Sequence, residues 1–200
     1  MKLSKIEQLE KNLWVINEMD KTLMYVINGT SKVLLIDTGL GITDLKAEIK
    51  NICGDKPVVA VNTHAHIDHN AGNFQFPEVY VGRYDEPFSH KPVNESERKL
   101  SEEMFFKEAV SQGYDVSKWS PGICPCIRTL AEGDRIELGE YCLRVIEIPS
   151  HTIGSIALLE EKQGWLFTGD VILTWEVWGH LSMGTDMCLA PSAALRVYFR

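Results

Sequence analysis

The most informative stretch of the chain lies at residues 63–69 and consists of Thr63-His64-Ala65-His66-Ile67-Asp68-His69. Imidazole nitrogens and carboxylate oxygens are ligands for zinc and other borderline divalent metals. His64 and His66 are two residues apart, so an extended backbone turns both rings to one side. His66 and His69 are three apart, which suits the first turn of a helix. Burying these groups without partners would be costly, so the stretch predicts a metal site and not a chance histidine-rich loop.

The histidine stretch directly follows a short apolar run, Val58 to Val61, that is typical of a strand buried on both faces. A similar run, Val33 to Asp37, ends at a turn. Chemistry just past the carboxyl end of a strand is the expected location of a site on a framework of strands and helices. Further strands are predicted at 13–17, 23–28, 135–138, 141–148, 155–159 and 165–168.

A first helix is expected to begin near Thr43, whose hydroxyl would cap its free amides. Leu45, Ile49 and Ile52 would share its apolar face, and Gly54 stands where a helix-ending glycine belongs. A last helix is expected at 191–198, with a proline in its first turn.

Residues 84–128 differ in character, because prolines interrupt them and residues 94–112 form a charged, helical pattern. Leu100, Met104 and Phe105 are its predicted apolar stripe. The segment is either a solvated surface helix or a cover over a substrate cleft, since long irregular connections are often functional.

Two later residues also follow predicted strands. His151 comes shortly after the strand that ends before Pro149, and Asp170 comes just after the strand 165–168. Either residue alone would more often be structural, as a hydrogen-bonded histidine or as a helix-capping aspartate. Their shared placement at strand ends makes both candidates for the same site as His64.

Composition narrows the class of protein. The 200 residues suit one domain, so we expect 1–200 to be a single domain with a helical insertion at about 84–128. The net charge of -8 disfavours nucleic acid as a partner. The five cysteines are scattered, and the segment 1–12 lacks an apolar run, so we expect a cytoplasmic protein that uses no disulfides, no signal peptide and no membrane anchor. The close pair Cys124 and Cys126 is interpreted as two incidental thiols.

Four motifs in order resemble the metallo-β-lactamase superfamily: Asp37-Thr38-Gly39, the stretch 63–69, His151-Thr152-x-Gly154-Ser155 and Thr168-Gly169-Asp170. The resemblance covers about residues 12–200. It implies an α+β fold, an αββα sandwich of two mixed β-sheets flanked by helices, with the metals at one edge.

The resemblance also implies a ligand set for two divalent metal ions, Zn²⁺ in the first place, with iron or manganese as alternatives. His64, His66 and His151 would hold the first ion. Asp68 and His69 would help to hold the second, and Asp170 would bridge both. Asp37, Thr38, Thr63, Thr152 and Ser155 are candidates for hydrogen bonds behind these ligands.

The sequence departs from the family pattern in one respect. Family members carry a further histidine ligand well after the bridging aspartate, whereas His180 lies too early and no histidine follows it. We interpret His180 and His90 as structural. We expect a chain cut short, without the last strand and helix, with a partly occupied second metal site and with an exposed sheet edge that a homodimer would cover.

The expected function is that of a metal-dependent hydrolase. A metal-bound hydroxide would attack a small-molecule thioester, lactone or other activated carbonyl ester, and Asp68 would be the catalytic residue that orients it or moves its proton. Trp175, Trp178 and the pair Phe105–Phe106 would wall the substrate. Two alternatives stay open: a mononuclear iron oxidoreductase of the sulfur dioxygenase type, and a metal-binding fragment without turnover.

Overall fold

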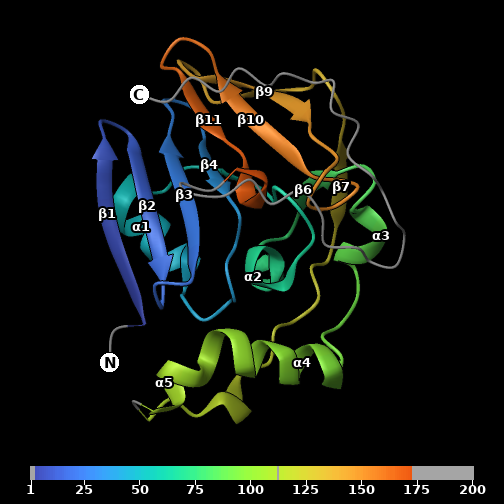
Figure 1. The fold of residues 1–200 in the computed structure, drawn as a ribbon. Helices are drawn as coiled ribbons and strands as arrows, with labels where there is room; N and C mark the ends of the chain where they lie inside the picture. Colours follow the sequence, from blue (N-terminus) through green and yellow to red (C-terminus); the bar gives the residue numbers. More distant parts are fainter. Residues whose placement is uncertain (1–2, 112, 173–200) are drawn as a thin grey trace.

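The strands of the chain form two sheets that pack face to face (Figure 1). This computed structural model describes residues 3–111 and 113–172. The first sheet contains β1 to β7 in chain order, and the second has the order β11-β10-β9-β8. In the first sheet the neighbours from β1 to β4 are antiparallel and those from β4 to β7 are parallel. Its strands are β1 (Ser4–Glu10), β2 (Leu13–Glu18), β3 (Thr22–Asn28), β4 (Val33–Ile36), β5 (Val58–Val61), β6 (Val79–Gly82) and β7 (Ile127–Leu130).

The second sheet is built from antiparallel pairs in the described part of the chain. Its strands are β8 (Arg135–Glu137), β9 (Cys142–Glu147), β10 (Ile156–Glu160) and β11 (Trp165–Phe167). These four strands, and β2 to β5 in the first sheet, lie where the sequence predicted them. β1, β6 and β7 were not predicted.

The main core lies between the two sheets, where Leu34 and Ile36 of β4 meet Leu143 of β9 and Leu158 of β10. The alternate residues Val33 and Leu35 point to the opposite face of the first sheet. There they pack against α1 (Leu45–Cys53), which lies behind the first sheet in Figure 1. The α+β sandwich with flanking helices is therefore confirmed. The helix expected at 191–198 falls outside the described residues.

The first helix begins at a different cap from the one predicted. The Asp44 carboxylate, and not the Thr43 hydroxyl, accepts the N–H of Ala47 at 3.1 Å. The Thr43 N–H donates to the buried carboxylate of Glu18 at 2.7 Å. The Thr43 hydroxyl oxygen is buried, and no described residue forms a hydrogen bond with it. Gly54 ends the helix as predicted, with φ +74°.

Residues 95–111 are helical, close to the predicted range, but their buried face differs. They form α4 (Glu95–Ser101), a π-helical turn η2 (Glu102–Phe106) and α5 (Lys107–Ser111). Leu100 and Met104 are 56% and 55% exposed, whereas Phe106 is fully buried against Tyr114 and Trp119. The predicted stripe was therefore wrong for Leu100 and Met104, whereas Phe105 is half-buried and packs against the same small core as Phe106.

The remaining short helices are α2 (Ile67–Asn70), η1 (Asn73–Gln75), α3 (Glu86–Ser89), η3 (Val116–Lys118) and η4 (Gly169–Val171). Phe106 belongs to a small core with Ala71, which directly follows α2, and this core joins the segment 94–111 to the end of the sandwich that carries the histidines. Among the described helices none is long and apolar enough to cross a membrane. Within residues 3–111 and 113–172 no disulfide forms, and Cys53, Cys124, Cys126 and Cys142 are free thiols there.

Candidate metal centre

The histidine stretch follows β5 after a single intervening residue, Asn62, and turns into the short helix α2. His66 is the extended residue before α2, and its carbonyl accepts the N–H groups of His69 and Asn70 at 3.0 and 3.1 Å. The predicted change from strand end to helical turn is thus present. It places four polar side chains at the tip of β5, where the parallel strands of the first sheet also end.

Three imidazoles form the first group. The candidate ligand nitrogens of His64, His66 and His151 all lie within 4.8 Å of one another, although His151 comes from the loop after β9 in the second sheet. The Nε2 atom of His64 and both ring nitrogens of His151 are buried, and no described residue forms a hydrogen bond with them. Buried polar atoms without partners are rare and costly. These free nitrogens fit a bound cation.

A second group lies next to the first and contains His64, His69 and Asp170. The Nε2 atom of His69 lies 3.2 Å from one oxygen of Asp170 and 3.4 Å from a carboxylate oxygen of Asp68. The other oxygen of Asp170 lies 3.7 Å from Nε2 of His151. Asp170 therefore offers one oxygen to each group, an arrangement that suits a carboxylate shared by two cations.

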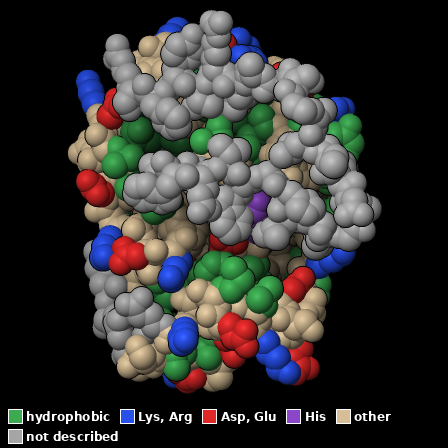
Figure 2. Space-filling view, in the orientation of Figure 1, with side chains coloured by type: hydrophobic (Ala, Val, Ile, Leu, Met, Phe, Trp, Pro, Cys, Tyr) green, Lys and Arg blue, Asp and Glu red, His purple; other side chains and the backbone are tan. Residues whose placement is uncertain are grey.

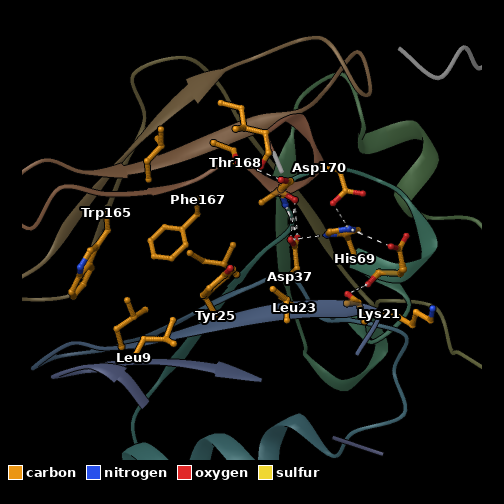
Figure 3. Close-up of a pocket in the computed structure, with 18 of the residues that line it drawn as sticks. Leu9, Lys21, Leu23, Tyr25, Asp37, His69, Trp165, Phe167, Thr168 and Asp170 are labelled. Atoms are coloured by element: carbon orange, nitrogen blue, oxygen red, sulfur yellow. Dashed lines mark hydrogen bonds and ion pairs between the residues drawn. The ribbon is translucent and has the colours of Figure 1, made fainter. Parts of the chain in front are cut away.

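A buried aspartate supports both groups from behind. Asp37, just after β4, lies with one oxygen 2.8 Å from Nδ1 of His69, and Figure 3 shows His69 between Asp37 and Asp170. The hydroxyl of Thr63 donates to Asp37 at 2.9 Å and lies 3.1 Å from Nδ1 of His64. Such hydrogen bonds fix the orientation and tautomer of metal-binding histidines. The supporting roles predicted for Asp37 and Thr63 agree with these contacts.

The backbone of α2 is anchored to three other parts of the first sheet. The carbonyl of His69 accepts the N–H of Thr38 at 2.8 Å and the side-chain amide of Asn62 at 2.9 Å. The carbonyl of Asp68 accepts the hydroxyl of Thr22 at 2.8 Å. The two side chains next to each other in sequence, Asp68 and His69, are therefore held in a defined position.

Burial and neighbouring charges shift the pKa values of the histidines in different directions. Burial lowers the pKa of His64 well below its ordinary value of 6.5, and it also lowers the pKa of His66 and His151. Burial would lower the pKa of His69 too, but the charge of Asp37 and hydrogen bonds to Asp170 and Asp68 raise it well above 6.5. The first group thus presents neutral imidazoles at neutral pH, the protonation state that metal binding needs.

Sequence reasoning missed one residue at this site, Asp85. It lies just after β6 and is 1% exposed. Its carboxylate contacts both histidine-bearing loops, by accepting hydrogen bonds from Ala65 and Thr152. Asp85 also follows a parallel strand. If β6 had been predicted, Asp85 would have been a site candidate for the same reason as His64, because it lies just past the carboxyl end of a strand.

A cavity of about 580 Å³ opens beside the second group. Figure 3 shows how it extends from His69 and Asp170 past Tyr25 and Phe167 to Leu9 and Trp165. Its walls come from both sheets. On the molecular surface a histidine is visible, and hydrophobic side chains gather between it and the helices α4 and α5 (Figure 2).

Other predicted site residues lie elsewhere. Phe106 is fully buried in the small core and is therefore unavailable to a substrate, while Phe105 is half-buried. His90 lies on the surface, 2.7 Å from Glu86, as a structural histidine would. Trp175, Trp178 and His180 fall outside the described residues.

The fold and the clustered ligands together define a class: two stacked sheets with a candidate site for divalent metal ions at one edge. The chain belongs to the metallo-beta-lactamase superfamily, whose sequence profile matches residues 19–179. The resemblance predicted from the four motifs is confirmed.

Relatives and solved structures agree with this assignment. The human protein named acyl-coenzyme A thioesterase MBLAC2 is 30% identical over 161 residues, which cover 74% of this chain and 57% of the relative. A hydroxyacylglutathione hydrolase from Bdellovibrio bacteriovorus is 49% identical over 43 residues, or 22% of this chain and 17% of the relative. The protein TTHA1623 in a di-iron-bound form has a similar fold, with a TM-score of 0.57, 22% identity and coverage of 81% of this chain and 73% of that one. The chain thus spans little more than half the length of the thioesterase that it resembles.

Proposed function

We propose that the chain is a hydrolase that cleaves a small-molecule thioester with the help of two divalent metal ions, Zn²⁺ in the first place. One observation carries the proposal: two histidine groups joined by Asp170, with buried ring nitrogens that have no hydrogen-bond partner among the described residues. The thioester is inferred from the relatives, because both are named for acyl groups attached to a thiol carrier, coenzyme A or glutathione.

The residues present suit two cations. His64, His66 and His151 would hold the first, Asp68 and His69 the second, and Asp170 would contact both. When bound, such ions lower the pKa of water towards neutrality and polarise a carbonyl oxygen. Histidine and carboxylate ligands also accept iron and manganese, so the choice of metal is part of the proposal.

Asp68 is the proposed catalytic residue. Its side chain is 16% exposed, and its backbone carbonyl is fixed by Thr22, so the carboxylate is held near His69 while one side stays open. From there Asp68 would orient the attacking water and accept its proton. Asp37 would hold the ring of His69 in place from the opposite side.

The cavity beside the cluster would receive the substrate. Its long wall is apolar and is formed by residues such as Leu9, Tyr25 and Phe167, which suits an acyl group. At the other end lies Lys21, the one lysine or arginine among the described residues that line the cavity. We expect Lys21 to meet the negative charge of the thiol carrier.

The proposal is tested by metal content and thioester cleavage together. The chain, purified without chelator, is assayed for metals by elemental analysis and for thiol release from acyl-coenzyme A and acylglutathione substrates. We expect a filled first site and a partly filled second site, and so between one and two ions per chain, together with turnover. His66→Ala should lose metal and activity together, the latter by more than about 100-fold, because even residues behind a metal ligand contribute tenfold to 100-fold.

His90→Ala is the matched control, since that histidine pairs with Glu86 on the surface. It should keep both metal and activity. Full activity in His66→Ala would refute the proposed centre. One iron per chain, with uptake of oxygen in place of thiol release, would instead identify the oxidoreductase, and bound metal without any turnover would identify a metal-binding fragment.

A further inference from the structure

Asp85 is buried between two loops, the one that follows β5 in the first sheet and the one that follows β9 in the second. Its own N–H donates to the carbonyl of Gly82 at the end of β6 at 2.9 Å, and its carbonyl accepts the hydroxyl of Ser89 at 3.0 Å. The residue is 1% exposed. The backbone of Asp85 is therefore tied to the first sheet and to α3, and its carboxylate points inward.

The carboxylate accepts three hydrogen bonds from two separate loops. One oxygen accepts the N–H of Ala65 at 2.8 Å and the hydroxyl of Thr152 at 2.7 Å. The other accepts the N–H of Gly154 at 3.0 Å. Ala65 stands between His64 and His66, and Thr152 directly follows His151. One buried side chain thus connects all three imidazoles of the first group.

The packing around this connection leaves little room for movement. A Cβ atom at Gly154 would lie 2.3 Å from the nitrogen of Asp85, and one at Gly82 would lie 2.0 Å from the carbonyl oxygen of Gly154. Both glycines are needed for this close approach of the two loops. The loop of His151 is therefore seated against the tip of β6 and not free to adjust by itself.

No described lysine or arginine forms an ion pair with Asp85, and the hydrogen bonds that its carboxylate accepts from the described residues all come from neutral donors. A buried carboxylate without a cation costs free energy unless each lone pair is well used. An apolar side chain would fill the space at lower cost, but it could not join the amides of two loops. Stability alone therefore does not explain the buried charge of Asp85. The charge serves to join the two loops.

We infer that Asp85 is a positioning residue that holds His64 and His66 of the first sheet at metal-binding distance from His151 of the second. The inferred role of Asp85 in function rests on the proposed metal centre. The inference itself concerns the relative position of the three imidazole rings, which can be measured in the metal-free protein. It therefore predicts effects both with and without metal.

The test uses Asp85→Asn, which keeps the shape but replaces one acceptor oxygen by a donor group that faces the loop amides. Glu18→Gln is the matched control, because Glu18 is also a fully buried carboxylate that accepts two backbone N–H groups, those of Leu40 and Thr43. Zn²⁺ affinity is measured by competition with a chromophoric chelator, and the geometry of the first site by the absorption spectrum of the Co²⁺-loaded protein.

Asp85→Asn should weaken Zn²⁺ binding by about tenfold to 100-fold and alter the Co²⁺ spectrum. Glu18→Gln should destabilise the protein to urea but leave both metal readouts unchanged. If Asp85→Asn loses stability as Glu18→Gln does and keeps affinity and spectrum, Asp85 has only a structural role and the inference is wrong.

The metal-free protein provides a second, independent readout. Imidazole ¹H–¹⁵N spectra should show shifted or broadened signals of His66 and His151 in Asp85→Asn, while those of His90 and of the Glu18→Gln variant stay unchanged. If the unmodified chain binds no metal, the proposed function fails, and these spectra still decide whether Asp85 positions the rings. Unchanged spectra would overturn the inference.

Discussion

At the scale of single residues, Asp37 has a strained backbone and a buried carboxylate that contacts His69. Its φ of +63° lies in the left-handed region, which costs of the order of 1–3 kcal/mol for a residue other than glycine. The strained backbone brings the carboxylate against both Thr63 and Nδ1 of His69. Strain of this kind persists only where surrounding contacts hold the residue in place. For Asp37 these contacts come from the tips of β4 and β5.

Asp37 gives a prediction about the pH dependence of stability. The raised pKa of His69 means that its contribution to the metal-free protein is fully present below about pH 6.5 and is lost as the pH rises through the folded-state pKa. The free energy of unfolding in urea should therefore fall with rising pH above that value. Asp37→Asn should reduce this fall, because it removes the charge that raises the pKa most.

Asparagine tolerates the left-handed region, so this variant keeps the backbone. Asp20→Asn is the matched control, since Asp20 has a φ of +58° but an exposed carboxylate that pairs with Lys5. Equal slopes in Asp37→Asn and the unmodified protein would show that Asp37 does not set the protonation of His69.

At the scale of elements, sequence patterns identified the strands that carry their own apolar run. β4 and β5 are continuous hydrophobic segments, and the histidines after β5 belong to a compact motif. β1 was missed because most of its residues are exposed and polar, so that pairing with β2 and not a buried face supports it. β7 likewise has two exposed residues in its centre.

The missed strands explain the missed site residue. β6 is only four residues long and ends in Gly82, so its short run Val79-Tyr80-Val81 was overlooked although these residues favour a strand. Without β6, nothing places Asp85 beside the histidine motif. His151 and Asp170 were found because their strands were found, whereas the contacts that join their loops depend on packing between the two sheets.

The first helix gives a prediction at the same scale. Asp44→Ala should lower the free energy of unfolding by about 1 kcal/mol, since it removes the side chain that caps α1. Thr43→Val should be neutral or stabilising, because the hydroxyl that it removes is buried and has no hydrogen bond to the part of the chain that the structure describes. Urea unfolding of both variants decides between the two caps, and a larger loss in Thr43→Val would favour the cap predicted from sequence.

At the scale of the whole molecule, the stacking of the two sheets creates the site and the cavity together. The histidines come from strand tips of both sheets. The cavity lies between the sheets and is lined by β3 of the first sheet and β11 of the second. A substrate bound there would contact both sheets at once. Its acyl group would lie between them, and its carrier would extend past Lys21 (Figure 3).

This placement predicts that Lys21 acts on binding and not on chemistry. Lys21 is exposed and forms no ion pair with the described residues, so its charge is available to an anionic carrier. Lys21→Ala should raise KM for acyl-coenzyme A by about threefold to fivefold, as expected for an exposed ion pair worth up to about 1 kcal/mol. The value of kcat should stay the same, and added salt should diminish the difference, because it screens exposed charges.

Lys46→Ala, an exposed lysine of α1, is the matched control and should leave KM unchanged. An uncharged acyl thioester separates charge from packing, because its KM should not respond to Lys21→Ala. A rise in KM that is equal for charged and uncharged substrates would mean that Lys21 contributes by contact alone. No change with either substrate would place the thiol carrier elsewhere, on a surface that does not include the turn between β2 and β3.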